Sequence, residues 1–381
     1  MKRANNLYEN MLEYEKALEM FYKIKRNCKN KEAIFRFMMN LNHNIITILM
    51  ALKNENYKFG KYRIFMIKDP KYRIVMSENI PDKLVNHLVS KYILLPALEP
   101  KLIDTNIATR IGKGSSYGFE TFISYVKKLQ PRKEEIYVLK IDISKYFYNI
   151  DHEILMELLR KYIKEEKTLR LLKIIIDTSD EEYVNKFVNH IKKLNIDKIR
   201  ASNLSRKEKE IKIAQIESLP TYQKGKGLPI GNMTSQILAI FYMNDVDHFI
   251  KEKLKAKYYI RYMDDLLILD TDKEKLKKYF ELIKVEIEKL KLTVNKKSNI
   301  FTMSHGVGFL GYVFKLKNGK IMIRYNNQTI RRITRKLKKL KDHDFDKFKK
   351  SKGSYFGYLK MSNTNLIDKD TYLIDDEFYV K

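Results

Sequence analysis

The sequence predicts an α+β fold that contains a small sheet built from strands far apart along the chain. Between residues 136 and 303, short apolar runs of strand length and longer helical segments follow one another in the order strand, helices, strand, strand, helix, strand. That order is the split βαβ pattern of a ferredoxin-like unit. Helices and a short hairpin precede this unit, and a small β segment and a basic helical region follow it.

The first part of the chain is predicted to be mainly helical. Apolar residues recur at helical spacing over residues 5–54, which predicts two helices. Alternating residues between Tyr57 and Met76, interrupted by Asp69-Pro70, predict a hairpin. Three elements are expected next: a helix from Pro81 to Leu95 that Pro96 ends, a glycine-punctuated loop at Arg110–Gly114, and a helix from about Gly118 to Leu129.

The predicted sheet and its connections come next. Its strands are expected at Ile136–Ile143, Tyr258–Tyr262, Leu266–Leu269 and Asn299–Met303. The connections are expected to be a basic helical stretch at 152–216, a turn-rich loop at Gly225–Gly231, a helix from Met233 to about Lys255, and a helix at Lys273–Leu290. A small β segment at Val307–Ile323 and a basic helical region complete the pattern.

The charge of the chain indicates a polyanionic partner. Its 381 residues include 76 Lys and Arg against 47 Asp and Glu, so the net charge is +29. Nucleic acid is the first partner expected for such a surplus. A lysine-biased, AT-rich genome is the alternative explanation, but the charge is also unevenly placed: residues 315–360 carry sixteen Lys or Arg and three Asp.

Several classes of site and location are excluded. Cys28 is the only cysteine, so the chain has no disulfide framework and cannot complete a cysteine-rich zinc site. The histidines do not fall at zinc-ligand spacings, which leaves oxygen ligands and favours magnesium or manganese. The first residues lack a signal peptide's apolar stretch, and the longest apolar run, near Ile45 to Leu52, is too short for a membrane span. We expect a cytoplasmic protein with no membrane partner.

Three aspartates lie where strands are expected to end. Asp142 follows an apolar strand, and Asp264-Asp265 lie between two further apolar strands. Adjacent carboxylates repel each other, and burying them on a tight turn is costly without a bound cation. Carboxylates held at strand ends are what two-metal nucleotidyl transfer requires. Ordinary turn chemistry explains an isolated Asp-Asp pair, but not its combination with Asp142.

These segments resemble motifs of the reverse transcriptases. The segment Tyr262-Met263-Asp264-Asp265 resembles the family's signature tetrapeptide, and the Asp142 segment resembles the first palm motif. Further motif-like segments occur in the family's order at Asp69–Ile74, Ala108–Gly114, Gly227–Gln236, Leu292–Ser298 and Phe309–Tyr312. The resemblance covers roughly residues 57–360. It implies an RNA-directed DNA polymerase with the right-hand polymerase fold of fingers, ferredoxin-like palm and helical thumb.

The resemblance also implies a domain organisation. We expect N-terminal helices at 1–56, fingers at 57–130, a palm at 131–303, a primer grip at 304–325, and a thumb with an acidic tail at 326–381. The basic helical insertion at about 160–220 is longer than the core motifs require. It is interpreted either as a surface for RNA or a partner, or as a solvated insertion.

Catalytic roles follow from the resemblance. Asp142 and Asp264 are expected to ligate two Mg²⁺ ions, with Mn²⁺ as the alternative. Asp265 is expected to support them, and the carbonyl of Ile143 to complete one site. Phe147 matches the steric gate, a bulky ring beneath the sugar that disfavours ribonucleotides, although a core aromatic is the alternative.

Substrate-binding roles follow in the same way. Arg73 and Lys71 are expected to bind the incoming triphosphate, because the planar guanidinium of arginine matches phosphate geometry. Arg110 and Lys113 are expected near the template or nucleotide, with a solvated loop as the alternative for Lys113. Lys297 is expected to assist the leaving pyrophosphate, and Lys296 competes for that role. The remaining expected contacts are nucleotide contacts at Ile230, Gly231 and Gln236, a primer grip at Phe309, Leu310, Gly311 and Tyr312, and phosphate-backbone contacts at Arg331, Arg332, Arg335, Lys336, Lys338 and Lys339.

One departure from the usual pattern narrows the resemblance. Many reverse transcriptases carry Gln-Gly and Ser-Pro in the fourth motif, where this chain has Ile230-Gly231 and Ser235-Gln236. That form resembles the enzymes of diversity-generating retroelements of bacteria, archaea and phages. The resemblance implies copying of a template-repeat RNA, with a DNA or RNA primer and deoxynucleoside triphosphates, into adenine-mutagenised cDNA. It also implies a small helical accessory protein. A retron, group II intron-like or phage-defence reverse transcriptase is the alternative enzyme. An inactive RNA-binding scaffold is the alternative that is not an enzyme.

Overall fold

The computed structural model describes residues 5–68 and 71–359, which belong to two compact units. Unit 1 comprises Met1–Thr109, Ile143–Leu254 and Ile283–Asn295, and unit 2 comprises Arg110–Asp142, Lys255–Leu282 and Lys296–Lys381. Asp69, Pro70 and the acidic tail that begins after residue 360 lie outside the described residues.

Unit 1 begins with four helices where the sequence predicted two. They are α1 (Leu7–Met11), α2 (Tyr14–Asn27), α3 (Lys31–Met39) and α4 (Leu41–Lys53). Asparagines lie at both boundaries between α2 and α4. Asn30 caps α3 by accepting a hydrogen bond from the backbone N–H of Ala33, and Asn40 has a non-helical φ of −129° between α3 and α4.

The predicted hairpin is present, and the helix after it continues further than expected. Strands β1 (Arg63–Ile67) and β2 (Arg73–Ser77) pair antiparallel, with Ile67 opposite Arg73. The helical path then runs through α5 (Ile80–Val89), the π-helical turn η1 (Ser90–Leu94), α6 (Leu95–Leu98) and η2 (Glu99–Lys101). Pro96 therefore does not end the helix. It lies in the first turn of α6, where a missing backbone N–H costs little.

The rest of unit 1 is helical. After the short α8 (Tyr146–Asn149) come α9 (His152–Arg160), α10 (Glu166–Asp177), α11 (Glu182–Arg200), α12 (Arg206–Glu217), α13 (Met233–Tyr242), α14 (Asn244–His248) and the π-helical turn η4 (Phe249–Lys253). The single helix predicted from Met233 to about Lys255 is thus divided. In the inserted region, α11 packs against α12 and β1, and its Val184 and Val188 join the hairpin residues Ile64 and Ile74 in one buried cluster. One face of the insertion is therefore part of the core.

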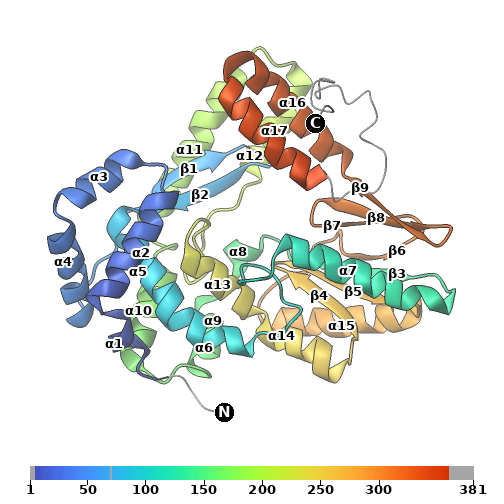
Figure 1. Cartoon of the computed structure of the whole chain (residues 1–381), viewed down its shortest axis with the longest axis horizontal. Coiled ribbons are helices and arrows are strands. Elements are labelled where there is room, and N and C mark those ends of the chain that lie inside the picture. The colour runs from blue at the N-terminus through green and yellow to red at the C-terminus, as the bar shows by residue number, and fades with distance from the viewer. Residues whose placement is uncertain (1–4, 69–70, 360–381) are drawn as a thin grey trace, which may run out of the picture. The chain divides into compact units, whose positions relative to one another are not determined.

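Unit 2 contains the predicted ferredoxin-like sheet. Its strands are β3 (Tyr137–Asp142), β4 (Tyr258–Tyr262), β5 (Asp265–Asp270) and β6 (Asn299–Thr302), in the order β4-β5-β3-β6 with antiparallel pairing throughout. Helix α7 (Ser115–Leu129) packs on β4 and β5 (Figure 1) and is followed by η3 (Gln130–Arg132). Helix α15 (Lys273–Lys289) connects β5 to β6 along the chain. The observed strand order confirms the predicted palm topology.

A second sheet and a helix pair complete unit 2. Strands β7 (Val307–Phe309), β8 (Tyr312–Lys317) and β9 (Lys320–Tyr325) form an antiparallel meander. Helices α16 (Asn327–His343) and α17 (Phe345–Leu359) pack on each other around Ile333, Leu337 and Phe348. Over the described part of the chain, no helix combines the length and the apolar character needed to cross a bilayer.

Candidate active site

Backbone pairing brings two of the three candidate aspartates together. The register of β3 and β5 places Asp142 directly opposite Asp265, and Asp264 lies in the turn between β4 and β5. Directly opposed residues of an antiparallel pair project to the same face of the sheet, with Cα atoms about 4.5–5.5 Å apart. The two carboxylates are therefore neighbours because of the strand register alone.

A buried arginine supports the turn that carries Asp264. Arg261, in β4, is fully buried, and its Nη1 donates a hydrogen bond of 2.8 Å to the carbonyl of Met263. Met263 has a φ of +55°, a left-handed conformation that is uncommon for a residue with a side chain. The hydrogen bond from Arg261 helps to hold this conformation in the turn.

Two further side chains contact the aspartates. The hydroxyl of Ser298 accepts from the backbone N–H of Asp142 at 3.0 Å and donates to its carbonyl at 3.3 Å. Lys140 forms an ion pair of 3.3 Å with Asp265, and its ammonium also donates to the carbonyl of Gly308 at 3.0 Å. The positive charge of Lys140 offsets part of the repulsion between the adjacent carboxylates.

The donor set at this sheet end fits a hard divalent cation. The three side chains offer carboxylate oxygens, the ligands that Mg²⁺ and Mn²⁺ prefer. Ile143, whose carbonyl is expected to complete the set, directly follows β3 and is buried; it forms a β-bridge with Val294 within unit 1.

In unit 1, strand β2, which begins with Arg73, is hydrogen-bonded to the loop Gly225–Gly231, which we call the fourth-motif loop. The backbone N–H of Met76 donates to the carbonyl of Ile230 at 2.9 Å. Gly231 has a φ of +133°, and a Cβ built there would lie 2.5 Å from the carbonyl oxygen of Met76. Glycine is therefore required for this close approach. Arg73 and Lys71 are exposed, as phosphate-binding side chains need to be.

The same loop contacts the segment that carries the predicted steric gate. The backbone N–H of Leu228 donates to the carbonyl of Phe147 at 2.7 Å, and that of Gly227 donates to Ile150 at 2.8 Å. The ring of Phe147 is half-buried and packs edge-on to Tyr146 at 5.9 Å. Gln236 is half-buried in the first turns of α13. Within unit 1, the structure thus links the backbones of Phe147, Ile230 and the strand of Arg73.

Three predicted cationic contacts lie in unit 2. Arg110 and Lys113 flank a turn closed by the Lys113 N–H to Arg110 carbonyl hydrogen bond of 3.2 Å, and both side chains are partly exposed. The ammonium of Lys113 lies 5.1 Å from the centre of the Tyr117 ring. Lys297 is exposed beside Ser298, and Lys296 is exposed as well, so exposure does not separate the two candidates.

The segment predicted as the primer grip forms the turn between β7 and β8. Leu310 and Gly311 both have positive φ, 49° and 86°, which is the pattern of a tight two-residue hairpin turn. Phe309 and Tyr312 flank the turn, but their rings are buried against Phe122 and Phe119 of α7, with ring centres 5.8 and 4.9 Å apart. These two rings are therefore part of the core of unit 2, and the turn itself is the exposed part of the motif.

Helix α16 separates its apolar and basic faces. Ile333 and Leu337 are buried against α17. The predicted phosphate-contacting side chains Arg331, Arg335, Lys336, Lys338 and Lys339 are exposed, and Arg332 is half-buried.

Sequence reasoning missed the residues that support these motifs. Arg261 interrupts an apolar strand, and a charge at such a position is a usable signal for a buried polar contact. Ser298 and Lys140 carry no comparable signal, because serine and lysine are ordinary residues at exposed positions.

Similar solved structures include apo telomerase from Candida tropicalis truncated from the C-terminal domain, with 14% identity, a TM-score of 0.47, and coverage of 70% of this chain and 55% of that chain. A second is telomerase from Candida albicans in complex with a fragment of telomeric RNA, with 14% identity, a TM-score of 0.42, and coverage of 75% of this chain and 50% of that chain. This chain thus spans about half the length of those proteins, and likeness at that level says nothing about its function.

No curated protein matched the chain. A family model described as reverse transcriptase (RNA-dependent DNA polymerase) matches residues 66–314, which is more than half of the chain and includes all three aspartates. The chain therefore belongs to the reverse transcriptase family.

Proposed function

We propose that this chain is an RNA-directed DNA polymerase that extends a DNA or RNA primer along an RNA template with deoxynucleoside triphosphates. The observation that carries the proposal is the pairing of Asp142 with Asp265, with Asp264 in the adjoining turn, in a chain of the reverse transcriptase family. Carboxylates at this position have the right chemistry to hold the metal ions of nucleotidyl transfer.

Different residues of the chain have different roles in the reaction. Asp142 and Asp264, with Asp265 in support, would hold two Mg²⁺ ions, which stabilise charge on the attacking and leaving oxygens when bound. Arg73 and Lys71 bind and orient the triphosphate, since exposed cations at a strand end can reach phosphate oxygens. Phe147 lies beneath the sugar and excludes a 2′-hydroxyl.

The template and primer are bound mainly through their phosphates. The exposed basic face of α16 and the net charge of +29 support this. Contacts of this kind are insensitive to sequence and weaken steeply as salt is added.

The test of the polymerase proposal is primer extension on an RNA template with Mg²⁺. Asp264→Ala should lower the extension rate by about a thousandfold or more, because the change removes a metal-binding carboxylate. Glu281→Ala is the matched control, since it removes one exposed acid from α15 in the same unit and should leave the rate unchanged. Continued synthesis by the Asp264 variant would refute the site assignment.

We further propose that the enzyme is the error-prone reverse transcriptase of a diversity-generating retroelement. The support is Ile230, whose half-buried aliphatic side chain cannot hydrogen-bond to a nucleotide, together with Gln236 after Ser235. Selectivity that depends on such polar contacts falls when they are absent. The proposal includes a template-repeat RNA, a small helical accessory protein, and a cytoplasmic location in a bacterium, an archaeon or a phage-infected cell. Retron, group II intron-like and phage-defence enzymes are the alternatives.

The test of the subfamily is fidelity. Ile230→Gln should lower misincorporation opposite template adenine several-fold, about the worth of one polar contact, as sequencing of the cDNA would show. Ile211→Gln, at an exposed position of α12, is the control. An unchanged error rate would remove the fidelity argument. Sequencing the DNA beside the gene for an imperfect repeat that differs at adenines tests the same proposal independently.

A further inference from the structure

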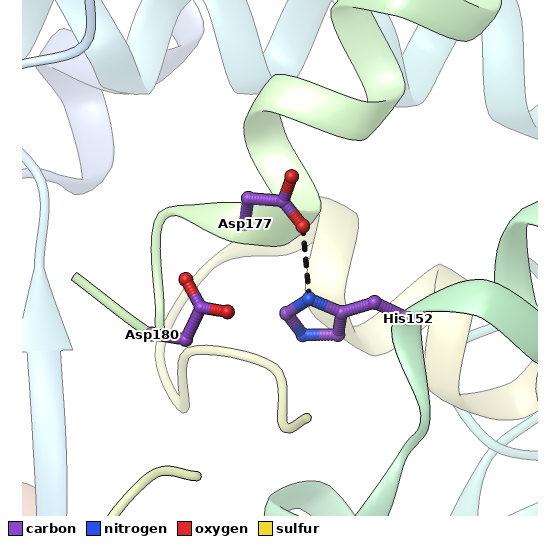
Figure 2. Close-up of side chains that lie close together, drawn as sticks. All are labelled: His152, Asp177 and Asp180. Atoms are coloured by element: carbon purple, nitrogen blue, oxygen red, sulfur yellow. Dashed lines mark hydrogen bonds and ion pairs between the residues drawn. The ribbon is translucent and has the colours of Figure 1, made fainter. Parts of the chain in front are cut away.

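Three side chains of unit 1 meet at one end of the fourth-motif loop (Figure 2). They are His152, the first residue of α9, Asp177, the last residue of α10, and Asp180, which follows α10. The ring of His152 is 1% exposed. Its Nδ1 lies 2.9 Å from Asp177 Oδ1, and its Nε2 lies 2.7 Å from the carbonyl oxygen of Gly227.

These contacts fix the orientation of the ring. A peptide carbonyl only accepts hydrogen bonds, so Nε2 of His152 donates to the carbonyl of Gly227, and Nδ1 faces the carboxylate of Asp177. Burial alone would raise the pKa of Asp177, but hydrogen bonds from His152 and Lys173 outweigh it and lower that pKa, which keeps the carboxylate ionised. Both ring nitrogens of His152 are occupied by these contacts, although His152, Asp177 and Asp180 lie close enough together to hold an ion.

The loop is held at two positions. The hydroxyl of Ser179 donates to the carbonyl of Gly227 at 2.7 Å, so that this oxygen has a donor for each lone pair. At Gly225, the backbone N–H donates to Asp180 Oδ2 at 2.6 Å, and the carbonyl accepts from the backbone N–H of His152 at 2.9 Å. Gly227 itself has a φ of +91°, and a Cβ there would lie 2.7 Å from the Tyr222 ring. We call His152, Asp177, Ser179 and Asp180 the loop clamp.

The loop clamp holds Gly227, three residues before Ile230, the first expected nucleotide contact in the loop. Leu228, next to Gly227, donates its backbone N–H to Phe147, and Ile230 accepts from Met76 in the strand of Arg73. A shift of the Gly227 carbonyl would therefore move Leu228 and Ile230, and with them the spacing between Phe147 and β2.

We propose that His152 is a positioning residue for the incoming nucleotide: by holding the Gly227 carbonyl, it sets the placement of residues 228–231 against Phe147 and β2. The inference rests on the proposed roles of Phe147 and Arg73 in binding the nucleotide. It assigns His152 no contact with substrate. Its expected signature is a change in nucleotide KM and in sugar selectivity that is not matched in template–primer affinity.

The experiment measures steady-state primer extension by the full chain. His152→Ala should raise the KM for deoxynucleotide about tenfold, the worth of one lost hydrogen bond. Discrimination against ribonucleotides should fall as well, while the Kd for template–primer should change less than about twofold. His190→Ala is the matched control, because His190 lies exposed on α11.

Changes at Asp177 separate the hydrogen bond from the charge. In Asp177→Asn, the amide can donate to Nδ1 of a neutral ring, which leaves Nε2–H on the Gly227 carbonyl, so the KM should stay within about twofold of the wild-type value. Asp177→Ala removes the orienting partner and should give a KM between those of the wild type and His152→Ala. Rescue by the asparagine is not expected if the site acts only through its net charge.

Three outcomes would overturn the inference. The first is a folded His152→Ala enzyme with unchanged nucleotide KM and sugar selectivity. The second is a parallel loss of template–primer binding, which indicates general destabilisation. If His152→Ala does not fold, Asp180→Ala and Ser179→Ala serve instead, because each removes one other contact of the loop clamp. Each should raise the nucleotide KM two- to fivefold. The third outcome that would overturn the inference is an unchanged KM in both of these variants. An inactive wild-type chain would instead count against the proposed polymerase function.

Discussion

The end of the β3–β5 sheet and the Gly225–Gly231 loop are held in place by different kinds of contact. At the sheet end, the strand ladder places Asp142 opposite Asp265, and Ser298 adds only a side-chain supplement. At the loop, side chains from the region of α9 and α10 hold two backbone positions, Gly225 and Gly227. The first arrangement therefore tolerates the loss of a side chain, whereas the second depends on individual side chains.

The difference follows from the number of hydrogen bonds that hold the backbone at each place. Asp142 ends a strand that pairs over six positions with β5 and over four with β6. Removing one supplementary hydrogen bond leaves that ladder intact. The carbonyl of Gly227 has two side-chain donors, and losing one leaves part of a buried acceptor unsatisfied, at a cost of about 1–3 kcal/mol.

The largest effect is expected at Gly231, where the loop meets β2. Gly231→Ala places a methyl group 2.5 Å from the carbonyl of Met76 and imposes a φ of +133° on a residue with a side chain. Strain and overpacking together should lower the free energy of unfolding by about 3–5 kcal/mol, measured by denaturant titration.

Gly112→Ala is the control for the backbone conformation alone. Gly112 also has a positive φ, +73°, but a Cβ there meets nothing within 4 Å. That change should cost about 1 kcal/mol. Equal losses in the two variants would show that the close approach to Met76 does not matter.

The two regions also differ in how far the sequence could predict them. The bounds of the sheet strands were predicted to within a residue or two, and their order was confirmed. Short apolar runs mark the strands, and the split βαβ order of strands and helices along the chain determines which strands pair. The neighbouring positions of Asp142 and Asp265 follow from that order. The assignment of their catalytic roles remains a prediction until the variants are measured.

The loop clamp could not be predicted from the sequence. His152 and Gly227 are 75 residues apart, and their contact depends on the packing of α9, α10 and the loop. A lone histidine beside an aspartate gives no local signal for such a contact. The helix boundary predicted at Pro96 was also wrong. Pro96 was expected to end a helix, but it lies within the first turn of α6, where its missing backbone N–H costs little.

A smaller effect, with a pH dependence, is expected at Glu78, which directly follows β2. Burial raises the pKa of Glu78 to about 8, and among the described residues its Oε1 has no hydrogen-bond partner. Between pH 4.5 and 8 the folded chain keeps a proton that the unfolded chain releases, so this group makes stability fall as pH rises. Glu78→Gln removes that dependence. The stability of the variant relative to wild type should therefore increase by about 2–3 kcal/mol between pH 5 and pH 7.

Denaturant titrations at the two pH values check this, with Glu153→Gln as the exposed control that should show no such change. A pH-independent difference for Glu78→Gln would mean that Glu78 is ionised in the folded chain at pH 5. In that case burial does not govern its protonation, and the strand of Arg73 would carry an additional negative charge beside the loop.

The smallest effect is expected at Ser298, and it tests the comparison directly. Ser298→Ala removes the hydroxyl that bonds both backbone groups of Asp142, yet the pairing of β3 with β5 remains. The free energy of unfolding should fall by about 1 kcal/mol, and the extension rate by less than about threefold. Ser304→Ala is the control, since within the described part of the chain Ser304 bonds only through its backbone N–H, which donates to Glu135. A rate loss at Ser298 larger than the effect of His152→Ala would reverse the comparison, because the strand ladder would then not be what holds Asp142 in place.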